Sequence, residues 1–391
     1  MARKAIKVAI FEPLGNLFGS ERSMLDLLGA LSLSNVELAV YCARNAPWLP
    51  LLRKLNLLVY DWFAIDLHKK SRWARATAFA KFLTFLMKER IELIHVNQAG
   101  AGPYALLAGH MLGIPVVLHS RWHEDGETIQ SWRHNTAALA RIVCISHYQM
   151  ELLERQLAPG SYDIAVVRNP YQRQGVDGAR KHVLPTGKPV FVCPARLHPH
   201  KRQDLLVRAT AIFKNTYGPC AIRFLGHEIN GIQYVEHLRQ LAHQLGVLDC
   251  IDFAGYSTDI IGELSESTGM VLPSETEALG RVIFEAWDAG TVPIAWRGSG
   301  GPAESIGGAD GGILYPHLTP ESLAEAMFQA TSMDGESRSL LIQNGVNWLE
   351  SNCAPENHAK AILAIWRDAI ARTVSVGTRG GRSAREGASY S

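Results

Sequence analysis

The sequence predicts an α/β protein made of two doubly wound domains, each with helices on both sides of a parallel sheet. Three observations favour this class. The chain of 391 residues is longer than one ordinary hydrophobic core, and its length suits two domains. Short runs of buried-strand character alternate with helical patterns in both halves of the chain. Glycine turns stand between several strands and the helices after them, which is typical of βαβ units.

The composition narrows the class of protein before any motif is considered. A hydrophobic fraction of 47% and a charged fraction of 19% are typical of a globular chain. The net charge of +2 gives no sign of a nucleic-acid partner. No run of about 18 apolar residues occurs, and the amino-terminal segment leads into a strand without a long apolar signal. We therefore expect a cytoplasmic protein without a membrane-spanning helix.

The six cysteines are spread along the chain without the C-x-x-C spacing of zinc or redox sites. This pattern predicts reduced and mostly buried thiols rather than a disulfide framework. They are Cys42, Cys144, Cys193, Cys220, Cys250 and Cys353.

The first strand, residues 6–11, is followed by a turn-rich segment and a helical pattern that begins near Gly19. Ser20 is a candidate N-cap, and Glu21 suits the first turn of the helix. A strand, a glycine turn and a helix at the edge of a parallel sheet make a candidate anion site, with Gly19 against the ligand. The alternative is that Gly19 serves only the turn itself, and the local pattern leaves both interpretations open.

Residues 69–90 form a helical pattern with an apolar face and many cations. Its apolar face carries Phe79, Phe82, Leu83 and Leu86, and Trp73 lies near its start. One interpretation, which we favour because a covering helix must be amphipathic, is a helix that covers the sheet with a solvated polar face. The other is peripheral contact with the anionic inner face of a membrane. The basic residues are Lys69, Lys70, Arg72, Arg75, Lys81 and Lys88.

A dense polar cluster, residues 119–125, follows the predicted strand 116–118. Ligands of doubly wound sheets bind outside the carboxyl ends of the strands, so His119 and Arg121 are candidate contacts to hydroxyl or phosphate groups. His119 and His123 have i, i+4 spacing, but a metal site is disfavoured because neither a clear helix nor a third ligand accompanies them.

The domain boundaries follow from breaks in the periodicity. The first domain closes near Asn169 and Pro170, which places it at residues 1–172. Residues 173–188 are rich in Gly, Arg, Gln and Pro and are predicted to link it to the second domain, residues 189–354. The Gly-, Ser- and Arg-rich tail, residues 373–391, is predicted to be disordered.

In the second domain, Arg196 and Lys201 flank a turn between the strand 190–193 and the next helix. The forked donor of arginine and the point charge of lysine can together neutralise a diphosphate. The alternative, that both are ordinary solvated loop cations, stays open on the local pattern.

The stretch 273–295 holds Glu277 and Glu285 eight positions apart, with Gly280 between them. Its loop leads into a helix, whose amino end offers free backbone N–H groups and a partial positive charge to an anion. Two carboxylates beside an anion site suit a ligand with both hydroxyl and phosphate groups. A nucleotide sugar has both.

Taken together, these residues resemble the retaining glycosyltransferases of family 4, also called group 1, over about residues 5–370. The most specific match is the E-x7-E block of Glu277 and Glu285, followed by Gly290 and Pro293. The pair Arg196 and Lys201 matches the diphosphate clamp of the family. Weaker matches occur in the order and spacing of the family: Gly19 to Arg22, His95, Gly113 to Val117, Ile145 and Ser146, and Asn169 and Pro170.

The resemblance implies the GT-B fold, in which two facing Rossmann-like domains bind acceptor and donor across a cleft. It implies that Glu285 holds the ribose, and that Glu277 faces the donor sugar and diphosphate. Arg196 and Lys201 would stabilise the departing diphosphate. It also implies that residues 355–372 form a helix that packs back on the first domain. Further implied contacts are the backbone N–H groups of Ala278, Leu279 and Gly280, Gly19 at the phosphates, Tyr256 at the base, and His119 or Arg121 at the donor sugar.

The sequence departs from the family at four places. Phe18 and Ala195 replace glycines before Gly19 and Arg196, and Arg202 stands where glycine is usual. The loop after Glu277 keeps only its last glycine, Gly280. These changes weaken any transfer of substrate specificity from the family.

The resemblance therefore implies a hexosyl-type transferase that moves a sugar from a nucleotide-diphosphate sugar to an acceptor hydroxyl, with retention of the anomeric configuration. The acceptor would be a glycan, a lipid-linked or a small molecule. The implied process is polysaccharide or glycoconjugate biosynthesis. No Asp-x-Asp motif occurs in a suitable loop, so metal independence is expected. Two alternatives remain. One is a non-catalytic nucleotide-sugar-binding protein. The other is a glycoside hydrolase with Glu277 and Glu285 as its paired carboxylates, although a hydrolase needs no nucleotide site.

Overall fold

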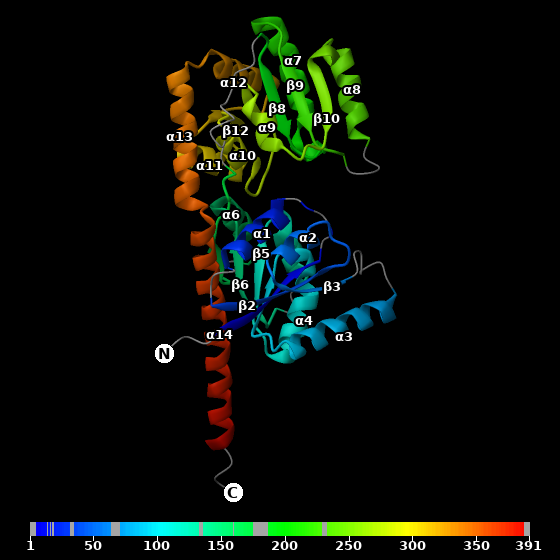
Figure 1. Cartoon of the computed structure of the whole chain (residues 1–391), viewed down its shortest axis with the longest axis vertical. Coiled ribbons are helices and arrows are strands. Elements are labelled where there is room, and N and C mark those ends of the chain that lie inside the picture. Colours follow the sequence, from blue (N-terminus) through cyan, green and yellow to red (C-terminus); the bar gives the residue numbers. More distant parts are fainter. Residues whose placement is uncertain are drawn as a thin grey trace. The chain divides into compact units, whose positions relative to one another are not determined.

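The computed structural model describes residues 5–13, 15, 17, 19–31, 35–63, 71–132, 136–158, 160–174, 187–228 and 233–386. The chain divides into two compact units, coloured along the sequence in Figure 1. Unit 1 comprises Met1–Tyr171 and Cys353–Ser391, and unit 2 comprises Gln172–Asn352. Each unit is described by itself.

Over its described residues, unit 1 contains a parallel sheet of seven strands in the order β3-β2-β1-β4-β5-β6-β7. Its strands are β1 (Ile6–Glu12), β2 (Val36–Ala43), β3 (Leu58–Phe63), β4 (Leu93–Val96), β5 (Val116–Ser120), β6 (Leu139–Cys144) and β7 (Ile164–Val166). Its helices are α1 (Gly19–Leu31), α2 (Leu49–Lys54), α3 (Arg72–Lys88), η2 (Ala99–Ala101), α4 (Gly102–Leu112), α5 (Asp125–Gln130), α6 (His147–Gln156) and α14 (Pro355–Glu386).

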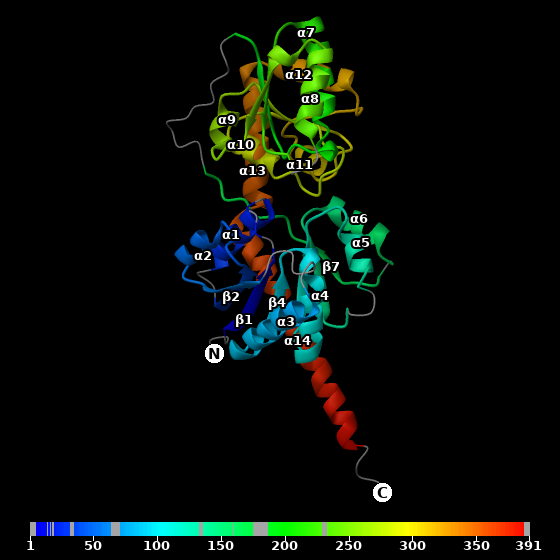
Figure 2. The same ribbon diagram turned by 90° about the vertical axis from the view of Figure 1, so that its right-hand side faces the viewer.

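Alternate side chains of β1 enter two different cores, because successive residues of a strand point to opposite faces of the sheet. Val8 and Ile10 pack in a core with residues of α1, α2 and α14. Ala9 and Phe11 pack in a core with residues of α3, α4, α5 and α6. Helix α14 runs past β4 on its side of the sheet (Figure 2) and places Trp366 fully inside the first of these cores. Unit 1 is therefore doubly wound.

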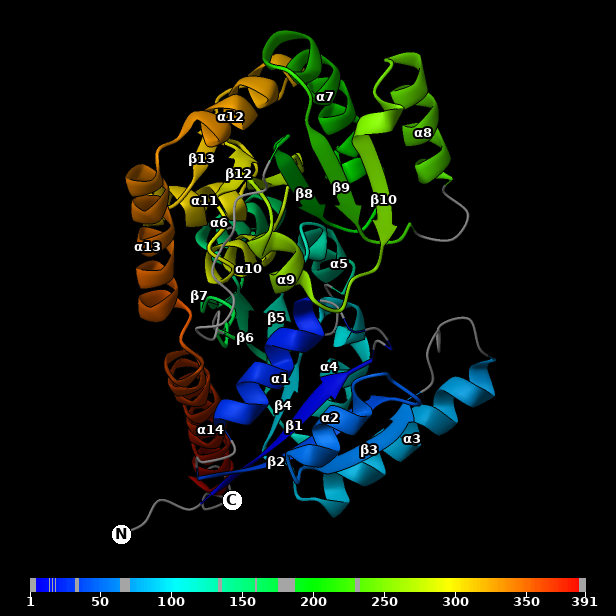
Figure 3. The same cartoon turned by 45° about the horizontal axis from the view of Figure 1, so that its top comes forward.

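Over its described residues, unit 2 contains a parallel sheet of six strands in the order β10-β9-β8-β11-β12-β13. One core joins α7, α8 and α12 to this sheet (Figure 3). The strands are β8 (Val190–Pro194), β9 (Ala221–Leu225), β10 (Ile251–Gly255), β11 (Gly269–Leu272), β12 (Pro293–Trp296) and β13 (Ile313–Tyr315). The helices are η3 (Pro199–Lys201), α7 (Gln203–Tyr217), α8 (Tyr234–Gln244), η4 (Leu248–Cys250), α9 (Ile260–Ser265), α10 (Val282–Asp288), α11 (Gly301–Ala309), α12 (Pro320–Ser332) and α13 (Gly335–Asn352).

The two parallel sheets confirm the predicted α/β class. The six cysteines are buried, as predicted, and none of them forms a disulfide. Burial raises the pKa of the Cys42, Cys144, Cys193 and Cys220 thiols to about 12. Of the described helices, none combines the length and apolarity that crossing a bilayer requires.

One local prediction was wrong. Ser20 is not an N-cap, because α1 already begins at Gly19 and Ser20 lies inside its first turn. Helix α14 continues to Glu386, into the tail that was predicted to be disordered from residue 373, and that disorder stays a prediction. No proline interrupts this segment, and extending an existing helix costs far less than nucleating one. Phe18, Lys69, Lys70, residues 175–186 of the predicted linker and residues 387–391 lie outside the described residues.

Helix α3 bears out the favoured interpretation of the basic helix over its second half. Phe82, Phe85 and Leu86 are buried in the core of unit 1, so this half covers the sheet. The first turns extend beyond the strands (Figures 1 and 3), and Trp73 is 85% exposed.

Candidate active site

The candidate residues other than Tyr256, which follows the edge strand β10, lie on or near the elements at the point where the strand order of each sheet reverses. In unit 1 this point lies between β1 and β4, and in unit 2 it lies between β8 and β11. Loops leaving the carboxyl ends of two such strands diverge, and ligands of doubly wound sheets bind in the crevice between them. Each unit therefore has its own cluster of polar side chains, and the two clusters differ in the residue types and interactions that form them.

In unit 2, an ion pair joins the two loops that flank the reversal point. Lys201, at the end of η3 after β8, pairs through Nζ with Oε1 of Glu277, in the loop after β11. Ser274 Oγ donates to the same carboxylate oxygen at 2.8 Å. The two charged side chains are only 17% and 16% exposed. The sequence predicted both as ligand contacts, and the structure brings them together.

The backbone around Glu277 is fixed by the loop before α11. Glu277 N donates to Ser299 O at 2.9 Å, and Gly301 N donates to Glu277 O at 2.9 Å. Gly280 has φ of +72°, and a Cβ at this position would lie 2.6 Å from Pro302 Cγ. This is the one glycine that the loop keeps, and both its conformation and its surroundings require it.

Glu285 lies about one turn into α10, as predicted, and its side chain is 12% exposed. Arg281 Nε stands 4.0 Å from its carboxylate, at i, i+4 spacing. Ala278 and Leu279 are buried, with 8% and 4% exposure. Their predicted role as backbone contacts stays a prediction.

Arg196 lies half-buried in the loop between β8 and η3. Its carbonyl accepts a hydrogen bond from Gln203 Nε2 at 3.0 Å. Arg202, which stands where the family has glycine, takes the left-handed conformation with φ of +52°. Its guanidinium lies 3.3 Å from Asp204 and 3.6 Å from Glu275. The loop thus keeps the glycine-like backbone without the glycine.

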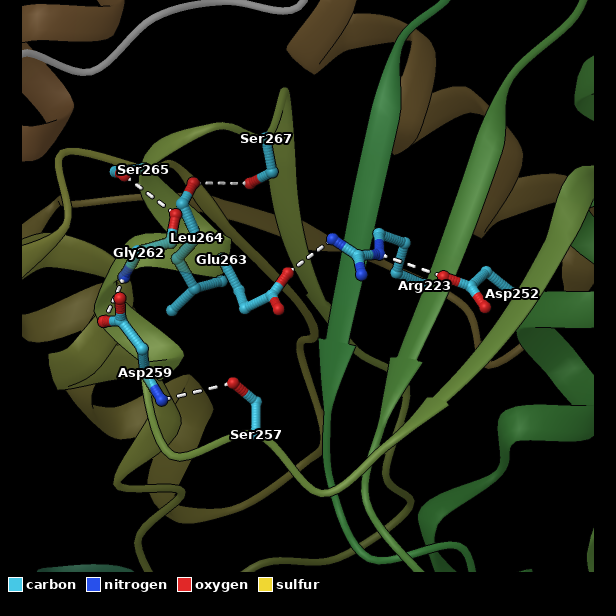
Figure 4. Close-up of polar contacts among 9 residues, drawn as sticks. All are labelled: Arg223, Asp252, Ser257, Asp259, Gly262, Glu263, Leu264, Ser265 and Ser267. Atoms are coloured by element: carbon cyan, nitrogen blue, oxygen red, sulfur yellow. Dashed lines mark hydrogen bonds and ion pairs between the residues drawn. The ribbon is translucent and has the colours of Figure 1, made fainter.

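Tyr256 directly follows β10 and is 51% exposed, with its ring stacked on that of His227. The segment after it is fixed by the N-cap of α9, where Asp259 Oδ1 accepts from Gly262 N at 2.9 Å. Arg223 of β9 bridges Asp252 of β10 and Glu263 of α9 (Figure 4). These contacts tie α9 to the sheet and hold the loop that carries Tyr256.

In unit 1, Arg121 is buried at the carboxyl end of β5 and binds neutral acceptors. Its Nε donates to Asn97 O at 2.9 Å, its Nη2 to Asn97 Oδ1 at 2.8 Å, and its Nη1 to Asn169 Oδ1 at 2.6 Å. The side chain thus links the ends of β4 and β5 to the segment after β7. Asp125 accepts from Arg121 N at 2.7 Å and Ser120 Oγ at 3.0 Å, which fixes the turn after β5.

His119 is fully buried beside Arg121, in a row of aromatic side chains. His95 Nε2 lies 2.9 Å from His119 Nδ1, and Trp366 Nε1 donates to His95 Nδ1 at 2.9 Å. The ring of His358 stacks on that of His119 with centroids 6.1 Å apart. Burial, and then the charge of Arg121, lowers the pKa of His119 well below its usual value and that of His95 to about 3. These imidazoles are neutral.

Gly19 is exposed at the amino end of α1, beside a group of buried carboxylates. Asn97 Nδ2 donates to Glu12 Oε2 at 2.5 Å, and Gln98 Nε2 donates to Glu21 Oε1 at 2.7 Å. Two carboxylates near this helix end add negative charge to the place where the sequence predicted an anion. The predicted contact of Gly19 with phosphates stays a prediction.

Two family models match the chain, one over most of each unit. Residues 18–187 match the glycosyl transferase 4-like domain, and residues 178–348 match glycosyl transferases group 1. The chain belongs to the group 1 glycosyltransferases.

The chain is similar to parts of curated proteins that include a mannosyltransferase and a phosphotransferase. The chain is 32% identical over 149 residues to a GDP-mannose-dependent phosphatidylinositol monomannoside mannosyltransferase of Mycobacterium tuberculosis, covering 36% of this chain and 37% of the relative. It is 31% identical over 191 residues to an exopolysaccharide phosphotransferase of Streptomyces coelicolor, covering 49% of this chain and 19% of the relative. The chain thus spans well under half the length of these relatives.

Solved structures show the same fold over nearly the whole chain. Anabaena HepE in complex with UDP-glucose superposes with a TM-score of 0.77 at 18% identity, covering 95% of this chain and 100% of that one. A sucrose-phosphate synthase from Thermosynechococcus elongatus superposes with a TM-score of 0.75 at 17% identity, covering 94% and 100%. These likenesses confirm the GT-B fold.

Several residues of both clusters in this group 1 glycosyltransferase were not predicted from the sequence. Asn97 and Gln98 directly follow β4, and polar residues at a strand's carboxyl end were the available signal. Ser274 lies inside the 273–295 stretch, three positions before Glu277. His358 and Trp366 lie on α14, far along the chain from their partners, and gave no local signal. Within the described residues, no three His, Cys, Asp or Glu side chains are arranged to hold a metal ion.

Proposed function

We propose that this chain transfers a hexosyl group from a nucleotide-diphosphate sugar to a hydroxyl of a glycan, lipid-linked or small-molecule acceptor, in polysaccharide or glycoconjugate biosynthesis. The observation that carries the proposal is the Lys201–Glu277 pair at the reversal point of the unit 2 sheet. A cation and a carboxylate held side by side suit a ligand that carries phosphate next to hydroxyl groups. Family membership and the relatives named as mannosyl- and glycosyltransferases support it.

In the proposed reaction, the bond between the anomeric carbon and the diphosphate oxygen breaks, and a bond from that carbon to the acceptor oxygen forms. The acceptor proton passes to the departing phosphate, and retention follows when attack and departure share one face of the sugar. Negative charge grows on the diphosphate as the bond breaks. Lys201 and Arg196 are the residues we propose to stabilise it, because preorganised cations act most strongly where charge develops.

The existing ion pair gives Lys201 a second role before the donor arrives. Without a donor, the carboxylate of Glu277 neutralises the lysine in a site of low exposure. A bound diphosphate would supply the counter-charge instead, which frees Glu277 to accept hydrogen bonds from sugar hydroxyls. Glu285, one turn into α10, is the proposed partner of the ribose hydroxyls. We propose that the reaction needs no metal ion, since these cations can carry the leaving-group charge.

Two measurements test this function. First, thermal unfolding with UDP, GDP or ADP should show a rise in melting temperature with at least one base, since a ligand that binds only the folded state stabilises it. Second, the matching nucleotide sugar should yield a glycosylated product. Glu277→Gln should abolish most of the product and keep the nucleotide-induced stabilisation. Glu275→Gln, in the same loop but 58% exposed, is the matched control and should keep both.

Each alternative predicts a different outcome. Stabilisation by a nucleotide without transfer to any acceptor would favour the non-catalytic binding protein. Cleavage of a glycoside in the absence of nucleotide would favour the hydrolase and overturn the transferase.

We also propose that the first turns of α3 contact an anionic membrane surface. Trp73 is 85% exposed, and the neighbouring Arg72 is exposed as well. Tryptophan favours the headgroup region and arginine is attracted to anionic lipids, so together they suit an interfacial contact. Lys81 and Lys88 continue the exposed cations along the helix.

Sedimentation with vesicles tests this contact. The chain should bind vesicles that contain phosphatidylglycerol more than vesicles of phosphatidylcholine alone, and Trp73→Ala with Arg72→Glu should remove the difference. Arg155→Glu on α6, whose side chain is 72% exposed, is the control for a charge change elsewhere in unit 1. Equal binding of all three proteins would refute the contact.

A further inference from the structure

The donor and the acceptor can be identified for each hydrogen bond in the row formed by Trp366, His95 and His119. An indole nitrogen can only donate, so Trp366 Nε1–H donates to His95 Nδ1 at 2.9 Å. His95 Nδ1 is then an acceptor without a proton, and a neutral imidazole carries its proton on the other nitrogen. His95 Nε2–H therefore donates to His119 Nδ1, 2.9 Å away. Because His119 Nδ1 accepts this hydrogen bond, the neutral ring of His119 carries its proton on Nε2.

Arg121 supports this assignment independently. Its Nη2 lies 3.3 Å from His119 Nδ1, and a guanidinium nitrogen can only donate. Two donors thus converge on His119 Nδ1, which excludes a proton on that atom. Burial and the charge of Arg121 disfavour the doubly protonated ring, as the lowered pKa of His119 expresses. One neutral tautomer remains.

His119 Nε2–H is the free end of this row. The nitrogen is buried and has no hydrogen-bond partner within the described part of the chain. Leaving a buried donor unpaired is costly, so such atoms in native proteins usually serve a ligand or bound water. The donor stands at the carboxyl end of β5, where a doubly wound sheet receives its ligand.

We propose that Trp366 and His95 are positioning residues that fix His119 in the Nε2–H tautomer, so that His119 donates a hydrogen bond to a substrate oxygen. The substrate half rests on the proposed function, whereas the tautomer half does not. Toward the substrate, His119 is a hydrogen-bond donor only, and it neither carries a proton nor accepts a hydrogen bond there. Its partner is a hydroxyl or carbonyl oxygen, and the helix that sets its polarity is α14, which lies more than two hundred positions further along the chain.

Nitrogen-15 NMR of the histidine rings tests the tautomers in the free protein. His95 and His119 should both show protonated Nε2 and bare Nδ1 at pH 7. His358 should show the opposite tautomer in the same spectrum, because its Nδ1 lies 2.6 Å from the Arg168 carbonyl, which can only accept. This ring is the internal reference. A protonated Nδ1 on His119 would overturn the proposal.

Two pairs of variants test whether the hydrogen bonds of the row, rather than the packing of its side chains, set the tautomers. Trp366→Phe removes the indole donor and should mix the tautomers of His95 and His119, whereas Trp48→Phe should leave them unchanged. Trp48 is equally buried in the same core, and within the described part of the chain its indole nitrogen has no hydrogen-bond partner. His95→Leu should mix the His119 tautomers, and His95→Gln should restore Nε2–H, because the glutamine amide both accepts from Trp366 and donates to His119.

Kinetics test the substrate half. Trp366→Phe and His95→Leu should raise KM for the sugar donor about three- to tenfold, the loss of one hydrogen bond, and His95→Gln should recover most of it. If the wild-type chain has the predicted tautomers but His95→Leu leaves KM unchanged, the substrate contact is refuted and the tautomer assignment stands. Absence of transfer by the wild-type chain would refute the proposed function, while the NMR result would still decide the tautomers.

Discussion

The site clusters of the two units occupy equivalent places in similar sheets, yet they differ in electrical character. In unit 1, His119, Arg121 and Asn97 are buried, and the guanidinium of Arg121 donates to the neutral Asn97 and Asn169 and lies 3.3 Å from His119 Nδ1. In unit 2, the central feature is an ion pair, Lys201 with Glu277, that keeps some exposure to solvent. A buried network with several hydrogen bonds holds one arrangement. An ion pair can exchange its partner for a charged ligand.

This difference indicates that unit 1 positions fixed hydrogen-bond donors, whereas unit 2 supplies charge that can pair with a ligand. Reorganising a buried network breaks several hydrogen bonds at once, so unit 1 offers fixed donors such as His119 Nε2. Exchanging the Lys201 partner costs less, because a diphosphate replaces the attraction that the lysine loses. The predictions below test whether the chemistry depends on charge in unit 2 and on structure in unit 1.

Replacing Lys201 should have the largest effect. Lys201→Ala removes a cation from the growing charge of the leaving diphosphate and leaves Glu277 uncompensated. We expect a loss of about a hundred- to a thousandfold in the transfer rate, the range found when one preorganised stabilising group is removed. Steady-state kinetics with the matching nucleotide sugar measure it. Lys214→Ala, which breaks an exposed pair with Asp249 in the same unit, should keep the wild-type rate. A loss of less than fivefold in Lys201→Ala would place the leaving-group charge elsewhere.

Acid should destabilise unit 1 more than unit 2. Burial lowers the pKa of His95 and His358 from 6.5 to about 3 in the folded chain. Between these values the unfolded chain binds more protons, so the stability from these neutral rings is complete above about pH 6.5 and is lost as the pH falls toward 3. Each ring contributes about 1.4 kcal/mol per pH unit in this window.

Urea unfolding, followed through the amide signals of β5 and of β12 at pH 7 and pH 5, measures this difference. The β5 signals should lose more stability between the two pH values, and His95→Gln should reduce that loss. Equal losses in β5 and β12 would contradict the distinction between the units.

Both the conformation of Gly280 and its lack of a side chain should matter for the stability of unit 2. Gly280→Ala forces an L residue into φ of +72° and places a methyl group 2.6 Å from Pro302 Cγ. We expect a loss of about 1–3 kcal/mol in the stability of unit 2. Thermal unfolding measures it. Gly335→Ala is the control in the same unit, since a Cβ there meets nothing within 4 Å. An unchanged melting temperature in Gly280→Ala would mean that the loop before α10 adapts freely.

The sequence could predict the unit 2 cluster better than the unit 1 cluster for a physical reason. Glu277, Gly280 and Glu285 lie within nine consecutive residues, so one loop and one helix present them together. The partnership of Lys201 with Glu277 was not predicted, because it depends on which strands become neighbours in the sheet. Strand order is a property of the whole fold.

The unit 1 cluster depends on contacts between distant segments. His119 and Arg121 were found because they follow a strand, but their roles were left open. Trp366 reaches His95 from α14, 271 positions away, and no periodicity indicates such a contact. The fold class was predictable from local patterns, whereas the hydrogen-bond polarity of His119 required the packed structure.

Replacing Arg202 should have the smallest effect of these changes, and the result shows how far the diphosphate-binding charge of unit 2 extends along the chain. Arg202→Gly relieves a left-handed backbone, worth about 1 kcal/mol, and loses the contacts with Asp204 and Glu275 at 3.3 and 3.6 Å, worth about 0–1 kcal/mol at a surface. We therefore expect the stability to change by less than about 1 kcal/mol, because the two terms oppose each other. A nucleotide titration followed by calorimetry should show less than about a fivefold loss of affinity, since the side chain is held by carboxylates outside the Lys201–Glu277 pair. A loss beyond tenfold would add Arg202 to the residues that hold the diphosphate, and the charge in unit 2 would then extend over the whole turn before α7.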